Sequence, residues 1–183
     1  MKQIDFVTVH FKQGDSKYER RLNILLEEID FHSHDLIKIL NIKNPRKIDV
    51  FVYPNREIKK IAFGGSDTDI TDVWGPSVHI TADDAPHRTL RHELVHAIAS
   101  QFGWHGLGFH PNMAITEGLA VALAPSGSRH NIHEMSSMLL HDGKIGDLKD
   151  LFSPVGFWSQ SGTKAYTVAG SFLLYLMRES GSD

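Results

Sequence analysis

The stretch His92-Glu93-Leu94-Val95-His96 contains two histidines and a glutamate, which are residue types that can bind a metal ion or transfer a proton. On a helix, residues four apart lie about 40° from each other around the axis, so both imidazoles can reach one zinc ion. Glu93 would then flank the open coordination position and could move a proton from an attacking water to a leaving amine. The spacing predicts a hydrolytic zinc site. Two core histidines beside an unrelated surface glutamate are the alternative interpretation.

A catalytic zinc ion that keeps one position for water needs a third protein ligand. Glu117 follows His96 after 21 residues and completes a set of two histidines and one glutamate. It is the one charged residue between Pro111 and Pro125, where a lone carboxylate would be costly to bury without a partner. An ordinary solvated glutamate is the alternative. His105 and His110 are other candidate ligands, but we expect them to be loop or surface residues.

The helices that carry these residues must direct their side chains toward one metal position. Asp83 or Asp84 as N-cap and Pro86 in the first turn predict the start of the motif helix, and Gly103 predicts its end. A second helix is expected from Asn112 to Ala124. Between the two helices lies a glycine-rich loop that could form part of a cleft wall.

Together with Glu117-Gly118-Leu119-Ala120, the histidine motif resembles the gluzincin zinc metallopeptidases, most closely their peptidase MA-like (thermolysin-like) domains. The segment from Tyr166 to Leu176 looks like the tyrosine-bearing helix of that family. The resemblance implies a zincin-like α+β fold, in which a small mixed sheet accompanies the active-site helix. It also implies zinc as cofactor, His92, His96 and Glu117 as its ligands, Glu93 as general base, and a peptide or protein substrate.

The chain departs from the family pattern at two places. Val121 stands where thermolysin-like relatives place an acidic residue that orients the first histidine. Met113 and Ala114 stand where related domains often carry a tryptophan. A partner for His92 must therefore come from elsewhere or be missing, and the pocket should differ in shape.

Peptide hydrolysis by zinc also benefits from a donor aimed at the developing oxyanion. Tyr166 and Tyr175 are nine residues apart on the expected last helix, so they point to opposite faces and only one can face the metal. Tyr166 occupies the tyrosine position of the family and shares a face with the small residues Ala169 and Gly170. We therefore expect Tyr166 to be the donor; core packing is its alternative role.

The remaining pattern predicts an α+β chain. Ile4 to Phe11, Ile48 to Tyr53 and Ser77 to Thr81 read as strands, and Ser16 with Glu19 forms a capping box before a long amphipathic helix. Residues 58–74 read as a mixed segment with a turn. By resemblance, Val78 to Ile80 would line the cleft edge and pair with an extended peptide. An inner strand without contact to a ligand is the alternative.

Composition limits the other function classes. With 183 residues and 41% hydrophobic content, we expect one domain over residues 1–183. The net charge of −3 comes from interspersed acidic and basic residues, which disfavours nucleic-acid binding. Without cysteine, no thiolate zinc site can form. No apolar run is long enough for a membrane segment and the start lacks the pattern of a signal peptide, while localisation and oligomeric state are not indicated.

Zinc-dependent hydrolysis of peptide bonds is the function that these features favour. The Gly-x-Met-Glu-Asn element with which related aminopeptidases hold a free N-terminus is absent from the sequence. Endopeptidase action is therefore favoured over aminopeptidase action. The alternative is a non-catalytic, zinc-containing peptide-binding or interaction module that kept the ligands and lost efficient turnover.

Overall fold

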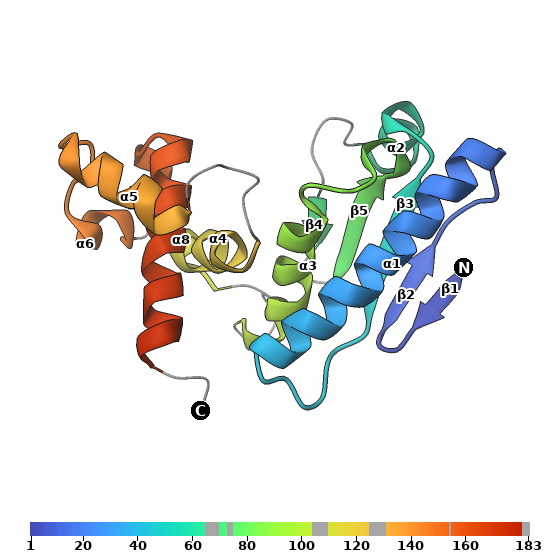
Figure 1. The fold of residues 1–183 in the computed structure, drawn as a ribbon, viewed down its shortest axis with the longest axis horizontal. Coiled ribbons are helices and arrows are strands. Elements are labelled where there is room, and N and C mark those ends of the chain that lie inside the picture. The colour runs from blue at the N-terminus through green and yellow to red at the C-terminus, as the bar shows by residue number, and fades with distance from the viewer. Residues whose placement is uncertain (65–69, 73–74, 104–109, 125–130, 154, 181–183) are drawn as a thin grey trace.

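The computed structural model describes residues 1–64, 70–72, 75–103, 110–124, 131–153 and 155–180. The chain has a mixed α and β fold in which a sheet with its helices lies beside a group of helices (Figure 1). The strands are β1 (Lys2–Ile4), β2 (Val7–His10), β3 (Ile48–Tyr53), β4 (Ile70–Asp72) and β5 (Ser77–Thr81). The helices are α1 (Ser16–Ile39), α2 (Arg56–Phe63), α3 (Leu90–Ala99), α4 (Met113–Leu123), α5 (Ile132–His141), α6 (Leu148–Leu151), α7 (Gly156–Ser159) and α8 (Gly162–Glu179).

The sheet has the order β1-β2-β3-β5-β4 and is mixed. Strands β2, β3 and β5 are parallel, whereas β1 and β4 pair antiparallel at the two edges of the sheet that the described residues form. Successive side chains of a strand alternate between faces, so every second residue is buried on the face that α1 and α3 cover (Figure 1). The buried residues on this face are Val7, Val9, Ile48, Val50, Val52, Val78 and Ile80.

The first strand and the first helix differ from their predicted forms. The expected strand from Ile4 to Phe11 is confirmed in part, as β2 (Val7–His10). Ile4 instead belongs to β1, which forms a hairpin with β2 that turns at Asp5, whose φ is 49°. Aspartate is among the few residues that tolerate this left-handed conformation. The long helix α1 is confirmed, but Asp15 caps it instead of Ser16, and its side chain accepts hydrogen bonds from the amides of residues 17 and 18.

The expected position of Val78 to Ile80 at the cleft edge is wrong. Strand β5 lies inside the sheet, parallel to β3 on one side and antiparallel to β4 on the other. The inner-strand alternative is correct. Strand β4, within the segment that reads only as mixed from sequence, is the edge strand next to α3.

The motif helix begins later than predicted. Asp83 and Asp84 belong to a separate 3₁₀ turn, and α3 starts only at Leu90. The carboxylates are used elsewhere: Asp83 pairs with Arg21 at 2.5 Å, and Asp84 pairs with Arg56 at 3.4 Å. Engaged in these ion pairs, neither aspartate caps the helix.

The two other predicted boundaries around the motif are confirmed. Helix α3 continues into a 3₁₀ turn that ends at Gly103. Asn112 caps α4, and its side chain accepts a hydrogen bond from the Ala114 amide at 3.0 Å. No helix in the described part of the chain is long and apolar enough to span a membrane.

Helix α4 lies between the sheet part and the helical part and packs against both α3 and α8 (Figure 1). Ala120 and Leu123 belong to the large core beneath the sheet. On another face, α4 contributes Ala114 to a second, smaller core. The other buried members of this second core are Leu151, Phe157, Ala165, Val168 and Ala169. One helix therefore shares its apolar surface between two cores.

Candidate metal centre

Helix α3 presents His92 and His96 on one face, while large apolar residues hold its other side against the sheet core. Leu90 and Leu94 are fully buried and Ile98 is nearly so. The two Nε2 atoms lie 3.1 Å apart, and the ring planes make an angle of 83°. Both Nε2 atoms thus point at the same small volume.

Helix α4 brings Glu117 to the same point. Its Oε2 atom lies 3.4 Å from the Nε2 atom of His92 and 3.4 Å from that of His96. A carboxylate oxygen and two imidazole nitrogens from helices α3 and α4 thus form a nearly equilateral triangle. Within the described residues, these three side chains are the one group of histidine, cysteine or carboxylate residues arranged to hold a metal ion.

The triangle fits tetrahedral zinc in size. Bonds of about 2.0–2.1 Å to nitrogen and oxygen place neighbouring ligand atoms about 3.3–3.4 Å apart at tetrahedral angles. The three observed distances are 3.1, 3.4 and 3.4 Å. Two histidines and one glutamate are also a donor set of catalytic zinc sites, in which the fourth position stays open. The spacing of the three ligand atoms therefore suits a zinc ion.

The Glu117 side chain is in the ionised form that a zinc ligand requires. Burial alone would raise the pKa of its carboxyl group, but hydrogen bonds and charge attraction from His92 and His96 outweigh burial and lower the pKa to about 2. Glu117 is therefore an anion at neutral pH. The side chains of His92, His96 and Glu117 are 21%, 11% and 13% exposed, so the site is lined by protein yet open to solvent.

Tyr166 of α8 faces this cluster, whereas Tyr175 does not. Burial is the main cause that raises the pKa of Tyr166. The charge of Glu117, a hydrogen bond to Glu117 and the charge of Glu93 raise this pKa further, to about 12. The phenol is therefore protonated at neutral pH and can donate a hydrogen bond. Its ring packs against Phe157 of α7 with centroids 5.2 Å apart. Tyr175 is 52% exposed on another side of α8.

Glu93 has a partner on the sheet. The hydroxyl of Thr71, in edge strand β4, lies 2.6 Å from the Oε2 atom of Glu93 and 3.1 Å from its backbone oxygen. Sequence reasoning missed Thr71, because nothing in the sequence indicates that a three-residue strand pairs at this place.

Arg91, also missed from sequence, connects three helices at the back of the site. Its Nε donates to the backbone oxygen of Leu123 at the end of α4. Its guanidinium also pairs with Asp35 of α1 at 2.6 Å and lies 3.2 Å from the His32 ring. The Arg91 side chain is 12% exposed and that of Asp35 is 36% exposed, so water reaches the ion pair only from the Asp35 side. These contacts fix α4 relative to α3 and thereby help to set the distance from Glu117 to the histidines.

Val121 stands where thermolysin-like domains have an acidic residue, and in this structure its side chain is part of a helix contact. Val121 packs against Gly170 of α8, where an added Cβ would lie 2.6 Å from the valine Cγ1. A side chain of this kind cannot hydrogen-bond His92. The structure thus uses this position for helix packing instead of orienting a ligand.

The other candidate histidines do not join the cluster. The His110 Nδ1 atom accepts a hydrogen bond from the Asn112 amide at 3.1 Å, next to the cap of α4. His105 lies outside the described residues. His133, in α5, is 2.9 Å from the Ser171 hydroxyl on α8.

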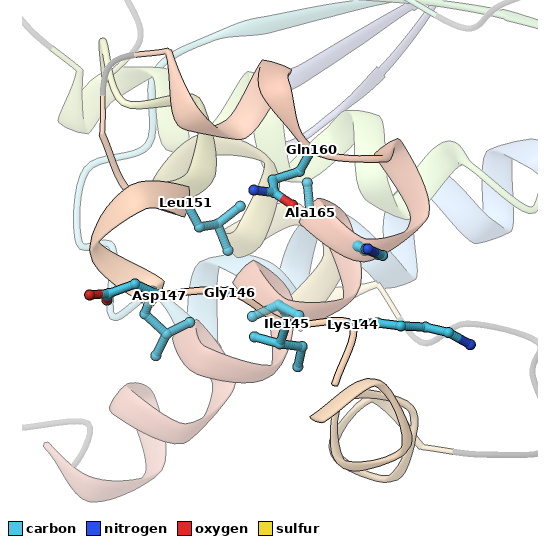
Figure 2. A pocket seen from close by; sticks show the side chains of 10 residues that line it. Lys144, Ile145, Gly146, Asp147, Leu151, Gln160 and Ala165 are labelled. Atoms are coloured by element: carbon cyan, nitrogen blue, oxygen red, sulfur yellow. The ribbon is translucent and has the colours of Figure 1, made fainter. Parts of the chain in front are cut away.

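A small hollow lies in the helical part, around the start of α8 (Figure 2). Lys144, Gln160 and Lys164 line it, together with the apolar Leu151 and Ala165. Its volume of about 20 Å³ has room for a water molecule. We place the candidate site at the histidine and glutamate cluster, because among the described residues this is the group of side chains that could hold a metal ion.

No protein-family model, curated protein or solved structure matches this chain. The chemical capacity of the site therefore follows from its own residues. The cluster offers three lone-pair donors at zinc spacing, a carboxylate on Glu93 that can exchange a proton, and a neutral phenol on Tyr166 that can donate a hydrogen bond. This combination is suited to hydrolysis of a polarised carbonyl group.

Proposed function

We propose that this chain is a gluzincin-type zinc metallopeptidase with a zincin-like fold, and that it hydrolyses peptide bonds. The observation that carries the proposal is the triangle of His92, His96 and Glu117, whose edges of 3.1, 3.4 and 3.4 Å suit a tetrahedral zinc ion. Strand β4 also lies at the edge of the described sheet, beside the motif helix α3.

His92, His96 and Glu117 would hold the zinc ion. When bound, zinc would polarise the scissile carbonyl and make a water molecule more acidic. The Glu93 carboxylate accepts the proton of the attacking water and delivers it to the leaving amine. Tyr166, kept protonated by its raised pKa, donates a hydrogen bond to the oxygen on which negative charge develops.

The substrate proposed for this site is an extended peptide or protein segment. Strand β4 is bonded to β5 on one side and is at the edge of the described sheet on the other. A peptide strand can add to such an edge through backbone hydrogen bonds. The absence of the Gly-x-Met-Glu-Asn element favours cleavage within chains over removal of N-terminal residues.

A non-catalytic, zinc-containing peptide-binding or interaction module is the second candidate. Val121 favours it, because this residue packs against α8 at the position where active relatives place a carboxylate to orient the first histidine. Zinc content is the same under both proposals. Turnover that depends on Glu93 distinguishes them.

The decisive experiment compares the parent protein and the Glu93→Gln variant on a mixed peptide library. Glutamine cannot accept the proton of water at neutral pH, so hydrolysis should fall at least ~10²-fold while zinc content stays the same. Glu27→Gln is the matched control, because Glu27 is exposed on α1. Equal cleavage by parent and Glu93→Gln would refute the mechanism, and no cleavage by the zinc-loaded parent would favour the binding module.

A further inference from the structure

Thr71 and Glu93 join the edge strand to the motif helix. In the sheet register Thr71 lies opposite Val78, a core residue. Residues opposite each other in neighbouring strands point to the same face, so the Thr71 side chain points to the face that carries α3. This direction brings its hydroxyl to the carboxylate of Glu93.

The hydroxyl of Thr71 has one proton and two possible acceptors on Glu93. The distance to Oε2 is 2.6 Å, and the distance to the backbone oxygen is 3.1 Å. A hydroxyl donates more strongly to an ionised carboxylate, and such bonds are short. The Oε2 atom is therefore the main acceptor, so the Oε1 atom would be the one that receives a proton.

We propose that Thr71 is a positioning residue that holds the Glu93 carboxylate in the orientation needed for proton transfer. This inference rests on the proposed peptidase function. A glutamate side chain has three rotatable bonds, and a single fixed oxygen removes most of its orientational freedom. Catalytic groups lose efficiency when displaced by about 1 Å, so a fixed carboxylate should raise the rate of the chemical step.

The location of Thr71 has a second consequence. Under the proposed function, β4 is also the strand to which the peptide backbone would bind. Substrate and base would thus be placed by the same strand, one through the backbone of β4 and the other through the Thr71 side chain.

The first test separates the hydroxyl from the shape of the side chain. Thr71→Val removes the hydroxyl and keeps the branched shape, and should lower kcat roughly 10–100-fold, the loss expected for a hydrogen bond to a charged group. KM and zinc content should stay unchanged, because neither depends on the orientation of the base. Thr71→Ser keeps the hydroxyl and should restore kcat.

Thr8→Val is the matched control. Thr8 also lies in a strand, and its hydroxyl donates to the side chain of Gln3 at 2.9 Å, far from the site in the sheet order. The same substitution there should leave kcat unchanged. If Thr71→Val folds poorly, Thr71→Ala removes the same hydroxyl without the second methyl group and is compared with Thr71→Ser.

The second test reads the carboxylate directly, without turnover. In zinc-free protein, the side-chain carboxylate ¹³C resonance of Glu93, assigned through its loss in Glu93→Gln, should move in Thr71→Val and keep its position in Thr71→Ser and Thr8→Val. An unmoved resonance in Thr71→Val, an unchanged kcat, or equal losses of kcat in the valine and serine variants would overturn the positioning role. If the parent hydrolyses no peptide, the proposed function fails, and the resonance alone decides whether Thr71 holds the carboxylate.

Discussion

The sheet part and the helical part of this molecule hold their site residues by different kinds of packing. Helix α3 is seated on the sheet by large buried side chains, among them Leu90, Leu94 and Ile98. Helices α4 and α8 instead approach through small residues: an added Cβ on Gly118 would lie 3.0 Å from the backbone of Ala169. The large side chains fix the position of α3 on the sheet. The small residues allow a short distance between α4 and α8.

The two kinds of packing position different residues of the site. The spacing of His92, Glu93 and His96 is local to one helix, so it needs only that α3 forms. The position of Glu117 depends on α4, and that of Tyr166 on the close contact of α8 with α4. Loss of any of the three zinc ligands should therefore abolish function, whereas changes in the contacts of α8 should weaken it by degrees.

The largest effect is expected from loss of the histidines. In His92→Ala, His96→Ala and the double variant, zinc content should fall from one ion per chain to near zero, and peptide hydrolysis should fall with it. The two protein ligands left in each single variant, or the one left in the double variant, hold zinc poorly. Metal analysis after dialysis measures the first effect. His141→Ala is the control, since His141 is exposed at the end of α5. Stoichiometric zinc in the double variant would show that the metal binds elsewhere.

A smaller effect is expected from the helical side. Tyr166→Phe removes one hydroxyl and leaves the ring packed against Phe157, so kcat should fall roughly 10–10³-fold with KM little changed. Glu117 and zinc should stay in place. Steady-state kinetics on one defined peptide measure this effect.

Tyr175→Phe is the control for the tyrosine, because Tyr175 is 52% exposed on another side of the same helix. It should leave the chemical step unchanged. If Tyr175→Phe slows hydrolysis and Tyr166→Phe does not, the donor has been assigned to the wrong residue. If neither variant matters, the helical part contributes packing alone.

Much of this arrangement follows from local sequence patterns. The four-residue spacing of the histidines, the cap at Asn112 and the alternating apolar residues of β3 are each decided by residues close in sequence, and the structure agrees with all three. The nine-residue spacing of Tyr166 and Tyr175 likewise shows that one helix cannot present both to the same point.

The features that sequence reasoning missed depend on partners distant in the chain. Asp83 and Asp84 look like helix caps, yet Arg21 and Arg56 engage them, and α3 starts later. Strand β4 exists through pairing with β5 and has no pattern of its own beyond three residues. Thr71 reaches Glu93 only because of that pairing, so no local signal could have identified it.

The smallest expected effect tests the close contact of α4 and α8. Gly118→Ala places a methyl group 3.0 Å from the carbonyl carbon and oxygen of Ala169 and 3.1 Å from its Cβ. Overpacking of this kind costs about 1–3 kcal/mol, while alanine favours a helix over glycine by about 1 kcal/mol. The free energy of unfolding should therefore fall by about 1 kcal/mol, measured by urea denaturation.

Gly162→Ala separates helix propensity from crowding, because Gly162 also lies in a helix and an added Cβ there meets no atom within 4 Å. This variant should be as stable as the parent or slightly more stable. Because Glu117 precedes Gly118 directly, a forced separation of α4 from α8 should also weaken zinc binding in Gly118→Ala and not in Gly162→Ala. Equal stabilisation by both substitutions would mean that α4 and α8 can separate freely. The small residues would then not set the distance on which Glu117 and Tyr166 depend.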